Sequence, residues 1–268
     1  MDIDYIINDY IENVLKNNDI DAVVLSGSRT SLINDDMSDY DIYIYSKNVV
    51  DIDTRIKFAE KYSSYYDIGN DYFEYGDELL LRDSGICLDF MYRDLSLAEN
   101  EINYVWRNFN SKIGYTTAFL YNIKHSHIFY DKNGCFKFFQ EELSKEYPEE
   151  LKNNIIKKNY NVMYGKKMAS FYEQLEKAVI RNDIISINHR ITAILSSYFD
   201  ILFALNKELH VGEKKLVQYA LKLCSKIPEN FEEDIKYILY NDYCINSGKT
   251  ILEKIKILIE NITKICKL

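Results

Sequence analysis

Cysteine is the first scarcity to note in this chain of 268 residues, which has five cysteines and no Cys-x-x-Cys pair. The five are widely spaced and odd in number. A disulfide framework needs paired cysteines, and a zinc knot needs closely spaced ones. The sequence therefore predicts neither.

A targeting signal and a long apolar run are lacking too. The opening residues, MDIDYIINDY, are acidic and contain no basic n-region, so we expect no signal peptide. The most apolar later stretch, ITAILSSYFDILFAL, is interrupted by Asp200 and is too short to cross a bilayer. We expect a cytoplasmic protein that does not enter membranes.

Basic residues are scarce in the first half of the chain. Residues 1–140 hold 24 Asp and Glu against 13 Lys and Arg, whereas residues 141–268 hold 18 against 20. An acidic field repels a polyphosphate chain, so general nucleic-acid binding is disfavoured. The same field attracts metal ions and cationic small molecules, although net acidity also aids solubility.

Proline is limited to Pro148 and Pro228, and only Gly165 and Gly212 interrupt the stretch between them. Apolar residues recur there at helical spacing, which predicts helices over 150–181, 183–208, 213–225, 230–243 and 249–265. Before Pro148 the pattern predicts helices at 3–15, 54–63 and 94–108, and strands near 22–25, 40–45, 72–75, 78–82, 86–92 and 127–130. The fold class is therefore α+β: an N-terminal α/β domain with a mixed sheet at 1–146, then an all-helical bundle domain at 147–268.

One stretch, LSGSRTSLINDDMSDYDIYIYS, holds the first candidate site. Asp-x-Asp occurs four times in the chain, so the pair alone is more often a solvated charge pair. Asp39 and Asp41 differ because they enter an apolar strand, where residues two apart share a face. Two adjacent carboxylates repel unless a cation lies between them, and Mg²⁺ prefers such oxygen ligands. We therefore expect a metal site here.

Two further elements would complete the site. The turn at Gly27 and Ser28 lets the backbone approach phosphate, and Arg29 adds a fork of donors. Asp89, in ICLDFMY, is costly inside an apolar strand unless it is bound to something. It could instead pair with Arg82 or Arg93. A strand beside 40–45 would bring Asp89 close to the Asp pair.

A strand, a Gly-Ser turn, an Asp-x-Asp entering a strand and a later LDF resemble the polymerase-β-like nucleotidyltransferases. The form GSRTSLINDDMSDYDIYIY is especially similar to the small bacterial antibiotic nucleotidyltransferases of the aminoglycoside and lincosamide type. The core resemblance covers about residues 20–92, and the helical second part extends it to the whole chain. The stretch YFDILFALNKELHVGEKKL also resembles an uncharacterised bacterial group of predicted nucleotidyltransferases.

The resemblance implies transfer of a nucleoside monophosphate, with AMP from ATP as the leading candidate, to an acceptor hydroxyl with release of pyrophosphate. It implies that Asp39 and Asp41 hold Mg²⁺ on the triphosphate. Asp89 would complete a two-metal site or take the proton of the hydroxyl. A lysine of the helical domain would reach the triphosphate, and Lys166 and Lys214 are the best candidates, with solvated helix lysines as the alternative.

The acceptor stays open. A small-molecule acceptor, such as an aminoglycoside-like cation, could have its amines received by acidic residues of the first half: Asp35, Asp36, Glu74, Asp77 and Glu78. A second hypothesis is modification of a protein or RNA in an antitoxin-like or signalling role. A third is a non-catalytic module that only binds nucleotide. The preferred nucleotide and the oligomeric state are not indicated.

Overall fold

The computed structural model describes residues 3–17, 19–30, 33, 38–166, 169–240 and 248–267. Asp35 and Asp36, expected at the exposed rim of the site, lie outside the described residues. So does Lys167, the neighbour of one lysine candidate.

The chain forms two compact units. The first comprises residues 1–103 and 122–145, and the second comprises residues 104–121 and 146–268. The predicted boundary after residue 146 had assigned residues 104–121 to the first part of the chain. In the structure this segment groups with the helices of the second unit instead.

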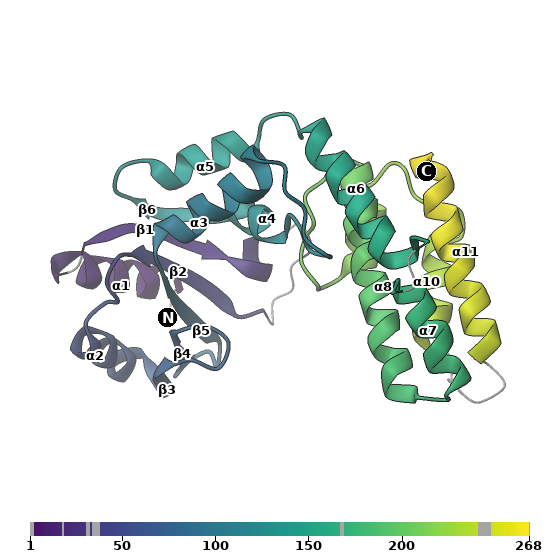
Figure 1. The fold of residues 1–268 in the computed structure, drawn as a ribbon. Helices are drawn as coiled ribbons and strands as arrows, with labels where there is room; N and C mark the ends of the chain where they lie inside the picture. Colours follow the sequence, from purple (N-terminus) through teal and green to yellow (C-terminus); the bar gives the residue numbers. More distant parts are fainter. Residues whose placement is uncertain are drawn as a thin grey trace. The chain divides into compact units, whose positions relative to one another are not determined.

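A six-stranded mixed sheet forms the centre of the first unit, in the order β3-β4-β5-β2-β1-β6 (Figure 1). Its strands are β1 Ile20–Ser26, β2 Tyr40–Ser46, β3 Ser63–Asn70, β4 Gly76–Leu81, β5 Cys87–Arg93 and β6 His127–Asp131. Strands β2 and β5 are parallel, and the other neighbours are antiparallel. The predicted mixed sheet is confirmed, but the strand expected at 72–75 was wrong, because β3 lies at Ser63–Asn70.

Helices cover both faces of this sheet. They include α1 Ile3–Asn17, α2 Ile52–Tyr62, α3 Leu95–Glu101 and α5 Cys135–Leu143. Helix α4, Ala118–His125, begins in the segment 104–121 of the second unit and ends in the first. A 3₁₀ turn, Gly27–Thr30, follows β1, and a π-helical turn, Ile102–Arg107, continues α3. In Figure 1, α1 and α2 lie on one face of the sheet, and α3 and α5 lie on the other.

Strand alternation decides which side chains enter the core. Ile42 and Ile44 of β2 and Phe90 of β5 are buried in one cluster with residues of α1 and α2. Tyr10 and Phe90 pack with their ring centroids 4.4 Å apart. Because successive residues of a strand face opposite sides, the intervening positions of β2 and β5 face away from α1 and α2.

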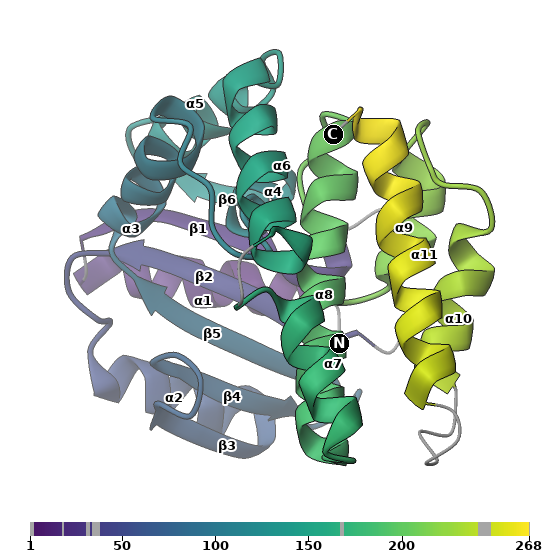
Figure 2. The same ribbon diagram turned by 45° about the vertical axis from the view of Figure 1, so that its right-hand side comes forward.

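The second unit is helical, as predicted for residues 147–268. Its helices are α6 Glu149–Tyr164, α7 Phe171–Ile180, α8 Ile184–Leu205, α9 Leu216–Leu223, α10 Phe231–Tyr240 and α11 Gly248–Cys266 (Figure 2). Asp183 caps α8 by accepting a hydrogen bond from the Ser186 amide at 3.1 Å. In the part of the chain that is described, no helix combines the length and apolar character needed to cross a membrane.

The single helix predicted over 150–181 is two helices, α6 and α7. Gly165 ends α6, and its amide donates to the Asn161 carbonyl at 3.1 Å. A Cβ at Gly165 would lie 2.5 Å from that carbonyl oxygen, so the close turn requires glycine. Ser170 then caps α7 by accepting from the Glu173 amide at 3.3 Å.

A buried polar network ties the segment 104–121 to the helices of the second unit. Asp200 of α8 is 1% exposed and accepts from the Thr116 amide at 3.0 Å and the Thr116 hydroxyl at 2.6 Å. It also accepts from Nδ2 of Asn159 at 2.8 Å, while Oδ1 of Asn159 accepts from the Gly114 amide at 2.9 Å. These bonds explain why residues 104–121 belong to this unit.

Candidate functional site

Three acidic side chains stand in a row across three neighbouring strands. Asp41 of β2 lies directly opposite Asp89 of β5, and Asp89 lies directly opposite Glu78 of β4. Residues that pair in this way project from the same face of a sheet. We call Glu78, Asp89 and Asp41 the carboxylate row, and it lies on the face away from α1 and α2.

The Gly-Ser turn begins where the row ends. Ser26, the last residue of β1, pairs with Asp41, and the turn Gly27–Thr30 follows immediately. Gly27 has a φ of 68°, and a Cβ built on it would lie 1.7 Å from Oδ2 of Asp41. Only glycine allows the chain to approach the carboxylate this closely. The sequence-predicted Gly27 and Asp41 are therefore in direct contact.

Arg29 links the turn to the strand that carries the Asp pair. Its Nε donates to the Ser38 carbonyl at 2.7 Å, and its guanidinium lies 4.4 Å from the centroid of the Tyr40 ring. These two residues flank Asp39, which is exposed just before β2. Ser28 is half-buried in the same turn. The turn and the Asp pair are thus held next to each other.

The electrostatics of Asp89 distinguish it from an ordinary surface carboxylate. Burial raises its pKa, and the negative charges of Asp39 and Glu78 raise it further, while a hydrogen bond from the Cys87 thiol at 3.3 Å opposes them. Burial and the carboxylates of Asp89, Asp39 and Glu78 raise the pKa of Cys87 to about 12. Cys87 is therefore a neutral thiol at physiological pH, and Asp39 is electrostatically close to Asp89.

The expected partner arginines of Asp89 are engaged elsewhere. Arg93 binds Glu74, with Nη2 at 2.6 Å from Oε2, and its guanidinium lies 3.7 Å from the Tyr43 ring centroid. Arg82 donates to the Ser63 carbonyl at 2.9 Å. These contacts therefore do not support the alternative in which Arg82 or Arg93 neutralises Asp89.

The carboxylate row offers oxygen donors of the kind that bind a divalent metal. Within the described residues, no group of three or more His, Cys, Asp or Glu side chains is arranged to hold a metal ion. Two facing carboxylates, Asp41 and Asp89, are nevertheless a donor set that suits Mg²⁺, which takes one or two protein carboxylates together with phosphate oxygens and water. The roles of Asp39, Asp41 and Asp89 as metal ligands all stay predictions.

Both lysine candidates belong to the second unit. Lys166 is exposed just after α6, and Lys214 is exposed in the turn before α9. A contact between these lysines and a triphosphate at the carboxylate row stays a prediction.

Two of the acidic residues expected to receive amines have other partners. Glu74 pairs with Arg93, and Asp77 forms a buried ion pair with Arg55 at 2.8 Å. The expectation that Glu74 and Asp77 receive amines of the acceptor was wrong, because an arginine already neutralises each carboxylate. Glu78 is exposed and stays available beside Asp89.

Several neighbours of the site carry no signal in the sequence. The Ser26 hydroxyl is hydrogen-bonded to that of Ser126. Asn122 accepts from the Gly27 amide at 3.3 Å and donates to the Tyr43 hydroxyl at 3.4 Å. About a hundred residues separate Asn122 and Ser126 from the turn they support, so only the tertiary fold places them there.

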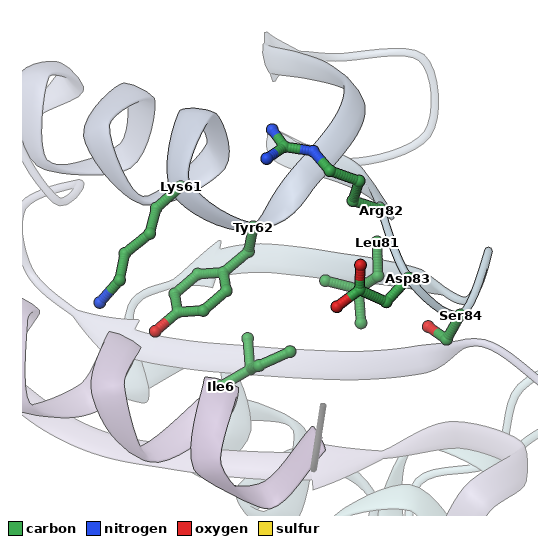
Figure 3. A pocket seen from close by; sticks show the side chains of 7 residues that line it. All are labelled: Ile6, Lys61, Tyr62, Leu81, Arg82, Asp83 and Ser84. Carbon is green, nitrogen blue, oxygen red and sulfur yellow. The ribbon is translucent and has the colours of Figure 1, made fainter.

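A separate small pocket of about 200 Å³ lies on the opposite face of the sheet (Figure 3). It is lined by Ile6, Lys61, Tyr62, Leu81, Arg82, Asp83 and Ser84. Lys61 and Tyr62 both bind Asp9, at 3.0 and 2.9 Å. Much of its polar lining is thus already used in contacts within the fold, and the carboxylate row is the stronger candidate site.

Comparison with known proteins gives three findings. Residues 114–215 match a family model described as a domain of unknown function (DUF4037). No curated protein matches the chain. Among solved structures, the chain is similar to a nucleotidyltransferase-like protein from Exiguobacterium sibiricum, with 9% sequence identity and a TM-score of 0.46. That match covers 96% of this chain and 75% of the other.

Proposed function

We propose that this protein is a Mg²⁺-dependent nucleotidyltransferase that moves AMP from ATP to a hydroxyl of a small-molecule acceptor. The observation that carries the proposal is the pairing of Asp41 with Asp89 across parallel strands, with the Gly27 turn in contact with Asp41. Two facing carboxylates beside a phosphate-binding type of turn fit the chemistry of nucleoside triphosphates.

Asp41 and Asp89 would hold the metal, with Asp39 as the further ligand at the entrance to β2. Bound there, Mg²⁺ would neutralise charge on the triphosphate during in-line displacement. The protein's own part is to hold the carboxylates close together. The Gly27 backbone, which lies against Oδ2 of Asp41, fixes the carboxylate's position from one side.

Asp89 is also suited to take the acceptor's proton. Burial and the nearby negative charges raise its pKa, and a carboxylate with a raised pKa accepts a proton more readily than a solvated aspartate. In the proposed step the acceptor oxygen attacks the α-phosphorus and the bond from that phosphorus to the bridging oxygen breaks. Pyrophosphate leaves with the bonding electron pair, and the hydroxyl proton passes to Asp89.

The turn Gly27–Thr30 would bind the phosphates. The Gly27 amide already donates to Asn122, and the Ser28 hydroxyl and the Arg29 guanidinium would be the donors to phosphate oxygens. Lys166 and Lys214 of the second unit would supply further positive charge, which the acidic first unit lacks.

Glu78 gives the acceptor side of the site its negative charge. It is exposed and sits beside Asp89 in the row, where an amine of a cationic acceptor would meet it. This favours an aminoglycoside-like molecule over RNA, since the acidic first unit would repel a polyphosphate.

The test is pyrophosphate release from ATP in the presence of Mg²⁺ and a panel of aminoglycosides, together with transfer of label from ATP labelled at the α-phosphate. Asp41→Asn and Asp89→Asn should each lower turnover by at least about 100-fold, because each removes a charge that acts in the transition state. Asp53→Asn is the matched control, since Asp53 belongs to another Asp-x-Asp pair and is exposed on α2.

The result discriminates among the three hypotheses. Label on a small molecule supports the proposal, and label on a protein or RNA moves the acceptor to that class. Mg²⁺-dependent ATP binding without any transfer identifies a nucleotide-binding module. Wild-type turnover in the Asp41→Asn and Asp89→Asn variants would refute the assignment of the site.

A further inference from the structure

The helical unit contains a pocket of about 410 Å³ that the proposed reaction does not use. Its size is typical of sites for small organic ligands, and it is lined mainly by apolar and aromatic side chains. The walls come from α8, the start of α9, α10 and the loop before α4. The principal lining residues are Tyr115, Leu195, Phe199, Leu216, Ile235 and Leu239.

The Tyr115 wall of the pocket is built in advance by buried polar contacts. Tyr115 has a φ of 53°, in the left-handed region, which is strained for a residue other than glycine. The residues on both sides are anchored: the Gly114 amide donates to Asn159 and the Thr116 amide donates to Asp200. These bonds hold Tyr115 in place, and so the pocket does not have to form when a ligand arrives.

Glu213 supplies the pocket's negative charge. It lines the pocket, is exposed, and has no hydrogen bond or ion pair within the described part of the chain. After burial, its negative charge is the main cause that raises the pKa of Tyr115, which shows that its field reaches the pocket wall. Lys215 also lines the pocket but already has an interaction within the protein.

We propose that this pocket binds a small molecule that joins an aromatic ring to a protonated amine. The ring would pack against Tyr115 and Phe199, whose faces also attract cations, and the amine would meet Glu213. This site lies within the second unit and does not depend on the nucleotidyltransferase proposal.

A matched pair of probes tests the charge preference. Tryptamine and indole-3-propionate share a ring system and differ in the sign of their charge. Titrated calorimetrically into the full-length protein, tryptamine should bind saturably and more tightly than indole-3-propionate. Glu213→Gln should weaken tryptamine binding by about 2- to 5-fold, the size expected for an exposed charge pair, and remove the preference. Glu229→Gln, an exposed residue outside the pocket, should change neither.

Two further variants test the location. Val217→Trp and Leu195→Trp each place an indole in the pocket from a different helix, and each should abolish tryptamine binding while circular dichroism stays native. The proposal is overturned if wild type shows no saturable tryptamine binding or binds both probes equally. It is also overturned if a natively folded filled variant binds as wild type does. If both filled variants lose their native spectrum, the Glu213→Gln titration decides.

Discussion

The backbone of Gly27 lies directly against the carboxylate of Asp41, so closely that a Cβ on Gly27 would be 1.7 Å from Oδ2. Strand β1 ends one residue before the glycine, and Asp41 is the second residue of β2. The contact therefore joins the turn that we propose binds phosphate to Asp41, a proposed metal ligand.

Gly27→Ala should abolish Mg²⁺-dependent ATP binding, because the added methyl group displaces the Asp41 carboxylate. It should also cost about 1–2 kcal/mol of stability, since alanine is strained at a φ of 68°. Gly134→Ala separates the two effects. Gly134 has a φ of 70° but nothing within 4 Å of a Cβ, so its variant should lose similar stability and keep ATP binding. Equal ATP binding by both variants would contradict the proposed role of the contact.

Glu78→Gln should shift the pH dependence of turnover. Glu78 raises the pKa of Asp89 by charge repulsion, after the larger effect of burial. If ionised Asp89 takes the acceptor's proton, kcat/KM rises with pH through that pKa. Removing the Glu78 charge lowers the pKa, so the rising limb should move to lower pH. If the rising limb stays in place, either Glu78 does not raise the pKa of Asp89 or Asp89 is not the base.

The pair of Arg55 and Asp77 should be the costliest polar contact to break in the first unit. Both side chains are almost fully buried, and Asp77 also accepts from the Gly69 amide at 2.8 Å and the Tyr92 hydroxyl at 2.6 Å. Asp77→Ala leaves the Arg55 charge unpaired and should cost about 3–5 kcal/mol in urea unfolding. Lys61→Ala breaks the exposed pair with Asp9 and should cost about 1 kcal/mol or less. Similar losses of unfolding free energy in the two variants would contradict the burial of the pair of Arg55 and Asp77.

Asp200 should make stability pH-dependent. Burial raises its pKa from 3.8 to about 6, against the opposing hydrogen bonds from Thr116 and Asn159. Because the folded state binds the proton more tightly than the unfolded state, the contribution of Asp200 falls as pH rises from 3.8 to about 6.

The size of this fall is bounded by about 3 kcal/mol, at about 1.4 kcal/mol for each pKa unit. Relative to Asp200→Asn, the unfolding free energy of wild type from urea titrations should therefore fall across this pH range. Parallel curves for the two proteins would contradict the raised pKa.

Much of the site's frame could be predicted from the sequence because strand alternation is local. The apolar runs on either side of Asp41 and Asp89 indicate strands, and the period of two puts both carboxylates on the polar face. The structure pairs these strands in parallel, with the two Asp residues opposite each other. Gly27 and Arg29 follow from their position just after β1.

What could not be predicted depends on contacts between distant segments. Asn122 and Ser126 meet the Gly27 turn only because β6 pairs with β1. Glu78 joins the row only through the pairing of β4 with β5. The sequence Ser63–Asn70 lacks a clear alternating pattern, so it does not predict β3. The need for glycine at position 165 is visible only in the close contact of its backbone with Asn161.

Mg²⁺-dependent binding of ATP is the most direct test of the central claim, because it needs no knowledge of the acceptor. Calorimetric titration of ATP into wild type should show saturable binding that is lost when EDTA replaces Mg²⁺. An Asp41→Asn/Asp89→Asn double variant should fail to bind with Mg²⁺, whereas Asp53→Asn should bind as wild type does. Equal, Mg²⁺-dependent ATP affinity in the double variant and wild type would show that the carboxylate row is not the nucleotide site.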